Sequence, residues 1–363
     1  MKKNKNYVDL KDQPVPEGQH LLEVDDLKMY FHTEDGVVRA VDGVSYTLDR
    51  GETLGVVGES GSGKSVTAMT IMGLISMPPG KIEGGDVRYR GRSILEMTEE
   101  EMQHIRGNDI AMIFQDPMTS LNPVYKIGKQ VGEGLRLHRG YSKQEALKRA
   151  TELLDLVGIP EPEKRVNEYP HQFSGGMRQR VMIAMALACD PDILIADEPT
   201  TALDVTIQAQ IIELMQEMQE KNGNAIIMIT HDLGVVADIA DKIMVMYAGR
   251  PVEFGTAEEI FYESRHPYTW GLIRSIPEQA IEEKKPLTPI HGNPPSLMNL
   301  PEGCVFSPRC PYATDKCRKQ RPERVVTESG HYSACHYSGD PEFLKNAPET
   351  SRTRKDSKKG GEA

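Results

Sequence analysis

Long hydrophobic runs are missing from this chain of 363 residues. Its longest uninterrupted apolar stretch runs from Val181 to Cys189, far short of the roughly 20 apolar residues that a membrane-spanning helix needs. The early lysines Lys2, Lys3 and Lys5 are not followed by an apolar segment, so they do not form a secretory signal. We therefore expect a chain that does not cross a membrane by itself and that works in the cytoplasm.

An excess of basic charge is also missing. The 43 Lys and Arg residues are outnumbered by 54 Asp and Glu residues, which gives a net charge of -11. No global positive field therefore draws the chain to nucleic acid or to anionic lipid. With 38% hydrophobic and 27% charged residues, the composition is that of a globular protein rather than a disordered one.

The apolar pattern predicts an α/β fold. Alternation with a two-residue period in LLEVDDLKMYF and VVRAVDGVSYTL predicts antiparallel strands near the start of the chain. Later short runs, β-branched or Met-rich, predict further strands. Several of them are apolar on both faces, which predicts a buried, largely parallel sheet. These runs are TLGVVG, DVRYRG, IAMIFQ, DILIAD, AIIMIT and KIMVMYAG.

Helices are indicated by two capping-box patterns. Thr98 precedes Glu101 and Ser142 precedes Glu145, a spacing that starts helices, so we predict helices over 98–106 and 142–157. The region from about 116 to 190 has no strand signals, and we expect it to form a mainly helical subdomain.

A glycine-rich segment, GESGSGKS, lies between the strand TLGVV and the helical pattern VTAMTIMGLI. This is the context of a phosphate loop, in which backbone N–H groups and the helix dipole bind phosphate oxygens. Lys64 is expected to bridge the β- and γ-phosphates, and the Ser65 hydroxyl to ligate Mg²⁺. The alternative is a surface turn before an ordinary helix. The loop residues are Gly58, Glu59, Ser60, Gly61, Ser62, Gly63, Lys64 and Ser65.

Two carboxylates end the apolar strand in DILIADEP at 192–199. We expect Asp197 to reach Mg²⁺, and Glu198, pointing the other way along the pleat, to orient or deprotonate the attacking water. A solvated acidic turn after a core strand is the alternative.

The order of the motifs resembles that of ATP-binding subunits of ABC transporters. GESGSGKS is followed by Gln115 in IFQDP, FSGGMRQR at 173–180, DILIADEP, TALD at 201–204, and His231 in ITHD. In that family this is the order of phosphate loop, Q-loop, signature, Walker B, D-loop and H-loop. The resemblance covers about residues 20 to 276.

The resemblance implies an ABC-type P-loop ATPase core, with a mixed sheet, an antiparallel β subdomain and a helical subdomain. It implies that Gln115 senses Mg²⁺ and the lytic water, that Asp204 links the two sites of a dimer, and that His231 contacts the γ-phosphate. Phe31, or Tyr30 in its place, would stack on adenine, although a core aromatic in a strand is the alternative. Ser174, Gly175 and Gly176 of the signature would contact the γ-phosphate held by a second subunit.

One chain has one phosphate loop and one signature, so the resemblance implies a head-to-tail dimer around two ATP and two Mg²⁺. The partner would be a second ABC ATPase subunit, in particular an F-type paralogue. The other implied partners are two transmembrane permease subunits and, indirectly, an extracytoplasmic solute-binding protein, with no nucleic acid. The chain would then lie peripherally on the cytoplasmic face of the membrane, docking through residues between Gln115 and about His138.

The C-terminal part resembles the extension of oligopeptide and dipeptide permease ATPases of the D-type, through HPYTWGLIRSIP, GNPPS and a group of cysteines. Four thiolates suit tetrahedral Zn²⁺ or an iron–sulfur cluster, and the resemblance favours a [4Fe–4S] cluster. Free or oxidised thiols are the remaining alternative. The cysteines are Cys304, Cys310, Cys317 and Cys335.

These observations predict four parts. They are a polar tail over 1–19, the nucleotide-binding domain over 20–276, a Pro-rich linker and four-cysteine module over 277–340, and a disordered basic tail over 341–363. The expected function is ATP hydrolysis that energises import of oligopeptides or dipeptides. The alternatives are an importer of nickel or another solute, and an ABC ATPase that acts on DNA or ribosomes.

Overall fold

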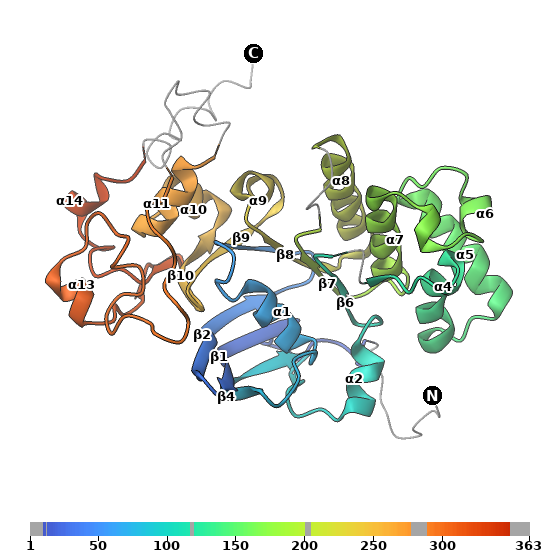
Figure 1. Cartoon of the computed structure of the whole chain (residues 1–363), viewed down its shortest axis with the longest axis horizontal. Helices are drawn as coiled ribbons and strands as arrows, with labels where there is room; N and C mark the ends of the chain where they lie inside the picture. Colours follow the sequence, from blue (N-terminus) through green and yellow to red (C-terminus); the bar gives the residue numbers. More distant parts are fainter. Residues whose placement is uncertain (1–9, 12, 117–119, 200–204, 277–288, 349–363) are drawn as a thin grey trace, which may run out of the picture.

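The computed structural model describes residues 10–11, 13–116, 120–199, 205–276 and 289–348. Within these residues, one sheet of four strands and one of eight are covered by helices (Figure 1), which confirms the predicted α/β class. None of the described helices is both long enough and apolar enough to span a bilayer.

The four-stranded sheet is antiparallel and comes from the N-terminal part of the chain. In β1, Leu22, Val24, Leu27 and Met29 are almost fully buried, although the spacing changes from even to odd between Val24 and Leu27. A register shift at this point returns the later residues to the core, because a bulge adds one residue to the strand. The strand order is β2-β1-β4-β5, and the strands are β1 (Leu22–Thr33), β2 (Gly36–Leu48), β4 (Gly80–Tyr89) and β5 (Arg92–Ser93).

The eight-stranded sheet is mixed, with the order β11-β12-β10-β9-β3-β8-β7-β6. Its central strands pair in parallel and are buried along almost their whole length, as their apolar runs predict. The DVRYRG run instead falls largely in β4 of the antiparallel sheet. The parallel strands are β3 (Thr53–Val57), β6 (Ile110–Ile113), β7 (Ile193–Asp197), β8 (Ala225–Thr230) and β9 (Lys242–Tyr247).

The helical subdomain lies beyond β6 (Figure 1) and contains no strand among its described residues, as predicted. Both capping boxes are present, at Thr98 and Ser142, where side chain and backbone bond reciprocally. The helices are α2 (Glu99–Ile105), before the subdomain, and α4 (Ile127–His138), α5 (Lys143–Leu156), α6 (Pro162–Arg165), the short 3₁₀ helix η1 (Pro170–Gln172) and α7 (Gly175–Leu187) within it.

The remaining helices follow the strands of the large sheet or belong to the C-terminal part. They are α1 (Lys64–Ile71), α8 (Val205–Asn222), α9 (Leu233–Ile239), α10 (Ala257–Tyr262), α11 (Pro267–Arg274), α13 (Asp315–Lys319) and α14 (Pro341–Leu344).

The C-terminal region is joined to the large sheet. The antiparallel strand β10 (Arg250–Thr256) pairs with β9 on one side and with the short β12 (Tyr332–Ser333) on the other, and β12 pairs with β11 (Val325–Val326). His331 Nε2 lies 3.0 Å from Glu253 Oε1 of β10, and both side chains are buried. The sequence predicted an appended module, and these contacts show that it shares the main sheet.

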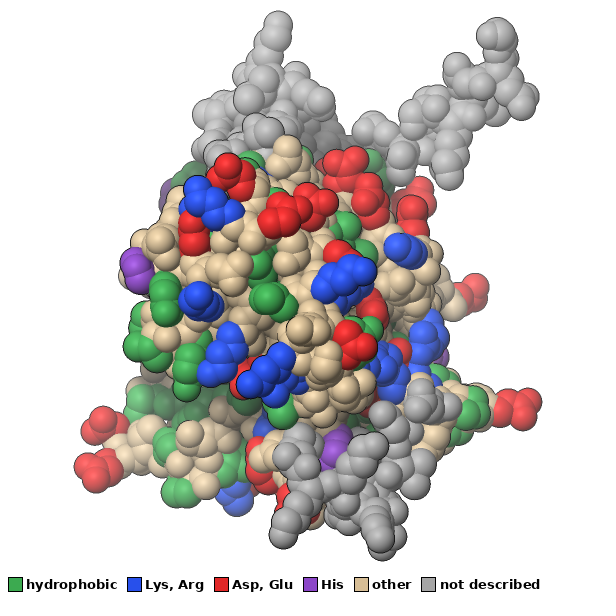
Figure 2. Space-filling view, turned by 90° about the vertical axis from the view of Figure 1, so that its right-hand side faces the viewer, with side chains coloured by type: hydrophobic (Ala, Val, Ile, Leu, Met, Phe, Trp, Pro, Cys, Tyr) green, Lys and Arg blue, Asp and Glu red, His purple; other side chains and the backbone are tan. Residues whose placement is uncertain are grey.

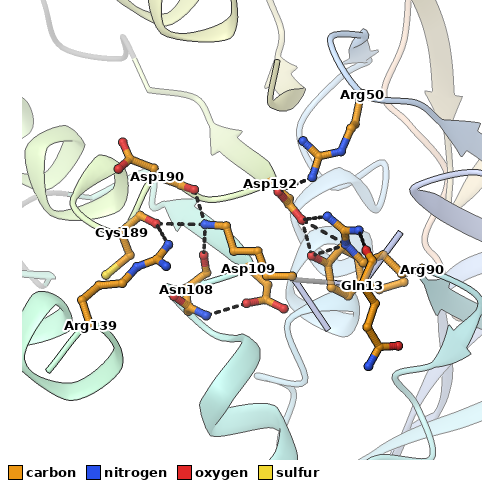
Figure 3. A network of polar contacts seen from close by, with 11 residues as sticks. Gln13, Arg50, Arg90, Asn108, Asp109, Arg139, Cys189, Asp190 and Asp192 are labelled. Atoms are coloured by element: carbon orange, nitrogen blue, oxygen red, sulfur yellow. Dashed lines mark hydrogen bonds and ion pairs between the residues drawn. The ribbon is translucent and has the colours of Figure 1, made fainter. Parts of the chain in front are cut away.

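The end of the N-terminal segment is held by a network of polar contacts that includes Asn108, Cys189 and Asp190 (Figure 3). Leu10 is buried, and Lys11 Nζ donates to the carbonyl oxygens of Asn108, Cys189 and Asp190. These acceptors flank β6 and β7, so the polar side chain of Lys11 connects loops that are far apart in the sequence.

A second group in the same region centres on Asp192 (Figure 3). Its carboxylate accepts from the Tyr89 hydroxyl at 2.6 Å and from Arg90 and Arg50. Burial opposes its ionisation, but these hydrogen bonds hold the pKa of Asp192 below its usual value. The pair of Arg90 and Asp192 is almost fully buried and links the antiparallel sheet to the start of β7.

Candidate active site

The phosphate loop connects β3 to α1, as the sequence predicts. Gly58 and Gly63 have φ angles of 151° and 99°. A Cβ atom would lie 2.2 Å from the carbonyl oxygen of Met246 at Gly58, and 2.3 Å from that of Ala40 at Gly63. Both positions therefore require glycine, because no side chain fits between the loop and its neighbouring backbone.

Lys64 begins α1 and is buried beneath the loop. Its Nζ donates to the carbonyl oxygens of Gly58 at 2.7 Å and Glu59 at 3.0 Å. Burial lowers the pKa of Lys64, against the opposing effect of the carboxylates of Glu198, Asp197 and Glu59. An ammonium held at this position can meet phosphate oxygens that enter the loop.

Oxygen ligands for a divalent cation lie together at the end of β7. Ser65 Oγ donates to Asp197 Oδ1 at 3.0 Å, although 132 residues separate them. Burial raises the pKa of Asp197, the hydrogen bond from Ser65 lowers it, and the charge of Glu198 raises it further. A hydroxyl and a buried carboxylate are the donors that Mg²⁺ prefers, so these residues fit a magnesium ion bound to phosphates.

Glu198 lies between two polar side chains that follow the neighbouring strands. Gln115 Nε2 donates to Glu198 Oε2 at 3.0 Å, and His231 Nδ1 lies 3.3 Å from Glu198 Oε1. Since β6, β7 and β8 are adjacent and parallel, their carboxyl ends bring these three residues to one edge. The arrangement holds a carboxylate that can take a proton from water, between the donating amide of Gln115 and the ring of His231.

The signature residues lie at the N-terminus of α7. Ser174 caps this helix, and its Oγ accepts from the Met177 N–H at 3.3 Å. Ser174 and Gly175 are exposed. In the described part of the chain, no hydrogen bond or ion pair joins residues 174–176 to the phosphate loop, so the two anion-binding turns of one chain are not combined into one site.

The two candidates for stacking on adenine, Phe31 and Tyr30, have other contacts in the structure. Phe31 is half-buried in β1 and packs against the core of the molecule, as the alternative interpretation expected, so its stacking on adenine stays a prediction. The Tyr30 hydroxyl donates to Asp42 at 3.0 Å. Asp204, with the rest of TALD, lies outside the described residues.

The four C-terminal cysteines line one small cavity together with Phe306, Tyr312 and Tyr337, among others. The four are Cys304, Cys310, Cys317 and Cys335, and all are free thiols. However, in residues 10–11, 13–116, 120–199, 205–276 and 289–348, no group of three or more His, Cys, Asp or Glu side chains is placed to hold a metal ion. The predicted [4Fe–4S] site, and zinc in its place, are therefore not supported: the thiols surround the cavity without meeting at a common point.

Glu59 of the phosphate loop has partners that sequence reasoning did not identify. Its N–H donates to the Tyr268 hydroxyl of α11 at 2.9 Å, and its carboxylate is paired with Arg309. These partners are 209 and 250 residues away, and no pattern in the sequence connects them.

Comparisons with known proteins agree with this geometry. A family model described as "ABC transporter" matches residues 41–201, and one described as "Oligopeptide/dipeptide transporter, C-terminal region" matches residues 252–317.

The oligopeptide transport ATP-binding protein OppD of Bacillus subtilis is 58% identical over 86% of this chain and 87% of its own length. The dipeptide transport ATP-binding protein DppD of Escherichia coli is 52% identical over 88% of this chain and 97% of its own. A solved dimeric post-hydrolysis state of the ATP-binding cassette MJ0796, bound to ADP and Pi, matches with a TM-score of 0.60 and 29% identity, over 65% of this chain and 98% of that one. The chain therefore belongs to the ABC transporter ATPases, which bind ATP and Mg²⁺ and hydrolyse ATP, in the group of oligopeptide and dipeptide transport ATP-binding proteins.

Proposed function

We propose that this chain is the subunit whose ATP hydrolysis energises import of oligopeptides or dipeptides through separate membrane permease subunits. The main observation in support of ATP hydrolysis is one cluster of side chains at the carboxyl end of β7. In it, Asp197 is bonded to Ser65, and Glu198 lies between Gln115 and His231. The match of residues 252–317 to the C-terminal region of oligopeptide and dipeptide transporters, and the names of the relatives, support peptides as the solute.

The site residues divide the reaction as follows. Lys64 and N–H groups of the loop over 58–65, other than that of Glu59, which is bonded to Tyr268, bind the β- and γ-phosphates. Ser65 and Asp197 would hold Mg²⁺, which neutralises phosphate charge. Glu198 is the general base for the attacking water. Gln115 and His231 orient the Glu198 carboxylate through its two oxygens, and His231 also meets the γ-phosphate.

A second ATPase subunit completes the site in this proposal. The exposed N-terminus of α7 supports it, because among the described residues no acidic side chain is seen bonded to the helix N–H groups of Ser174 to Gly176, and such N–H groups bind anions. The dimeric ATP-binding cassette among the structural neighbours is a further support. We propose an F-type paralogue as the partner, with Asp204 communicating between the two sites.

The permease contact is proposed for the segment between Gln115 and about His138. Large apolar side chains are exposed there, with Val124 at 70%, Tyr125 at 44% and Leu137 at 54%, as expected of a docking surface. Figure 2 views the end of the molecule formed by the helical subdomain, where apolar side chains lie among charged ones. Docking through this surface would hold the chain peripherally on the cytoplasmic face of the membrane, next to a permease that an extracytoplasmic solute-binding protein supplies.

The division into a nucleotide-binding domain over 20–276 and a cysteine-containing module over 277–340 is also a proposal. What supports it is the change to a Pro-rich and cysteine-containing sequence after residue 276. An aromatic cluster of Trp270, Tyr312, Tyr337 and Phe343 instead crosses both ends of the 277–340 module and packs it against α11 and α14. The shared β10–β12 pairing gives the two parts a fixed contact.

An iron–sulfur cluster in that module stays a prediction of the sequence. Four thiols around one cavity support it, and the lack of a metal-holding group among the described residues opposes it. Purification under anaerobic conditions, followed by iron, sulfide and zinc analysis, tests it. Brown protein with stoichiometric iron would support the cluster, and colourless protein without iron would refute it.

The experiment that tests the function is an ATPase assay on the chain assembled with its permease and partner ATPase. Peptide-loaded binding protein should stimulate turnover, and Glu198→Gln should retain ATP binding but lose turnover by about 100-fold or more. The exposed Glu217 of α8 provides a matched control, since Glu217→Gln should turn over normally. Undiminished turnover in Glu198→Gln would refute Glu198 as the general base. Stimulation by nickel rather than by peptide would refute peptides as the transported solute.

A further inference from the structure

The phosphate loop carries an acidic side chain, that of Glu59, whose carboxylate is held by an arginine of the C-terminal region. Arg309 Nη1 donates to Glu59 Oε2 at 2.6 Å and Nη2 donates to Oε1 at 3.0 Å. This is a bidentate pair with the parallel geometry that makes Arg–carboxylate contacts strong and directional. Because Tyr268 also accepts the Glu59 N–H, both the backbone and the side chain of this residue are fixed by groups outside the loop.

The side chain of Arg309 is also held in place by contacts other than those with Glu59. Its side chain is only 4% exposed, and it lies 5.8 Å from the centre of the Tyr247 ring. Its Nε donates to the His291 carbonyl at 2.9 Å, and Nη2 donates to the Ile290 carbonyl at 3.1 Å. These contacts use one edge of the guanidinium for the C-terminal region and leave the other edge for Glu59. The hydrogen bonds to Glu59 raise the pKa of Arg309, so the guanidinium stays charged.

The charge of Glu59 matters because the ligand of this loop is an anion. Lys64 contacts the Glu59 carbonyl directly and already lies near the carboxylates of Asp197 and Glu198. An unpaired carboxylate on Glu59 would add a negative charge at the entrance to a triphosphate site, in a partly buried region where screening by water is weak. Arg309 cancels that charge and also holds the carboxylate to one side.

We propose that Arg309 and Tyr268 are positioning residues for the phosphate loop, which fix and neutralise Glu59 so that the loop accepts the triphosphate of ATP. Nucleotide affinity is thereby coupled to the C-terminal region. The inference rests on the nucleotide-binding role of residues 58–65 proposed above, and it does not depend on the transported solute.

A purely structural role for Arg309 makes a different prediction. If Arg309 served only to anchor the segment of Ile290 and His291, its removal would damage the module whatever residue stood at position 59. If instead it cancels the charge of Glu59, removing that charge should make Arg309 dispensable for nucleotide binding. The two roles are therefore separated by a double-mutant cycle.

The experiment measures binding of AMP-PNP with Mg²⁺ to the full chain by isothermal titration calorimetry. We expect Arg309→Gln to weaken binding about fivefold at low salt, with a smaller loss at high salt because added ions screen the exposed carboxylate. Glu59→Gln should bind at least as tightly as the wild type, and Glu59→Gln with Arg309→Gln should return to within about twofold of the wild type. Arg318→Gln is the control, since it breaks an exposed ion pair with Asp315 in the same region and should bind normally.

Three results would overturn the inference. They are binding by Arg309→Gln equal to that of the wild type, a double variant as weak as Arg309→Gln alone, or a loss that high salt leaves unchanged. If Arg309→Gln does not fold, Tyr268→Phe replaces it, because it removes only the hydroxyl that accepts the Glu59 N–H. About twofold weaker binding would support the inference, and unchanged binding would reject it. Failure of the wild-type chain to bind AMP-PNP would instead reject the proposed nucleotide site.

Discussion

A buried histidine makes the C-terminal region sensitive to acid. His266 caps α11, where its Nδ1 accepts from the Tyr268 N–H at 3.1 Å, and it is almost completely buried. Its ring lies 5.9 Å from that of Phe306. Burial lowers the pKa of His266 to about 3, because the imidazolium would lose its hydration at this position.

The sign and size of the effect follow from this lowered pKa. Below the ordinary value of 6.5, the unfolded chain protonates His266 while the folded chain keeps it neutral until about pH 3. The unfolded state therefore binds more protons in this window, and the free energy of unfolding falls as the pH falls. The loss approaches about 1.4 kcal/mol per pH unit, so lowering the pH from about 6.5 to about 4.5 should cost about 2 kcal/mol through this residue alone.

The assay compares the wild type with His266→Asn by denaturant unfolding at a series of pH values. Asparagine keeps a side-chain oxygen that can cap the helix but does not titrate. Trp270, the single tryptophan of the chain, is buried in the same helix and reports unfolding by its fluorescence. The variant is expected to be less stable near neutral pH, because it leaves a cavity, but to lose less stability on acidification. Parallel pH dependences for the two proteins would refute the reasoning.

Three other substitutions test the phosphate loop, the buried pair of Arg90 and Asp192, and the signature at the start of α7. Gly63→Ala places a Cβ 2.3 Å from the Ala40 carbonyl oxygen, so calorimetric titration should show at least about tenfold weaker AMP-PNP binding, and unfolding a loss of about 1–3 kcal/mol; wild-type affinity would contradict this. Asp192→Ala leaves Arg90 buried without its partner, and denaturant unfolding should show a loss of about 3–5 kcal/mol, whereas a loss near zero would show that Tyr89 or water replaces the pair. Ser174→Ala removes the α7 cap, which should lower the free energy of unfolding by about 1 kcal/mol. It should also abolish turnover of the assembled transporter, while the isolated chain still binds AMP-PNP. Normal turnover would count against the proposed dimer site.

Local signals predicted much of this molecule. The parallel strands are short apolar runs, and the capping boxes at Thr98 and Ser142 formed where the spacing placed them, because both signals depend only on residues close in sequence. The loop at 58–65 is of the same kind. Asp197 and Glu198 were placed at the strand end by the apolar run before them, whereas the roles of Gln115 and His231 were implied only by the family resemblance. Their contacts with Glu198 follow from the parallel pairing of β6, β7 and β8.

Contacts between distant segments could not be predicted in this way. The strands β11 and β12 have two residues each, too few for any alternation to be visible, and they are defined by pairing with β10 rather than by their own pattern. Leu10 and Lys11 belong to a polar segment and are placed by contacts with residues distant in sequence. Leu10 packs in a core cluster with residues of β1 and β4, and Lys11 donates to carbonyl groups of the loops before β6 and β7. The four cysteines show the limit of residue chemistry in the other direction. Their chemistry suggested a metal site, but in the part of the chain that the structure describes they line one cavity without forming a group placed to hold a metal ion.

The backbone at Glu198 explains how two adjacent carboxylates perform different tasks. The sequence suggested that the pleat of a strand turns them apart, but β7 ends at Asp197, and Glu198 has a φ of 47°. For a residue with a side chain, this left-handed conformation costs about 1–2 kcal/mol. It persists because the Glu198 N–H donates to the Ile229 carbonyl of β8 at 2.8 Å while the side chain is held by Gln115 and His231. The strained turn therefore leaves Asp197 facing Ser65 and directs Glu198 toward the residues that follow β6 and β8, so the separation of the cation ligand from the proposed base is a property of the sheet edge and not of the two carboxylates alone.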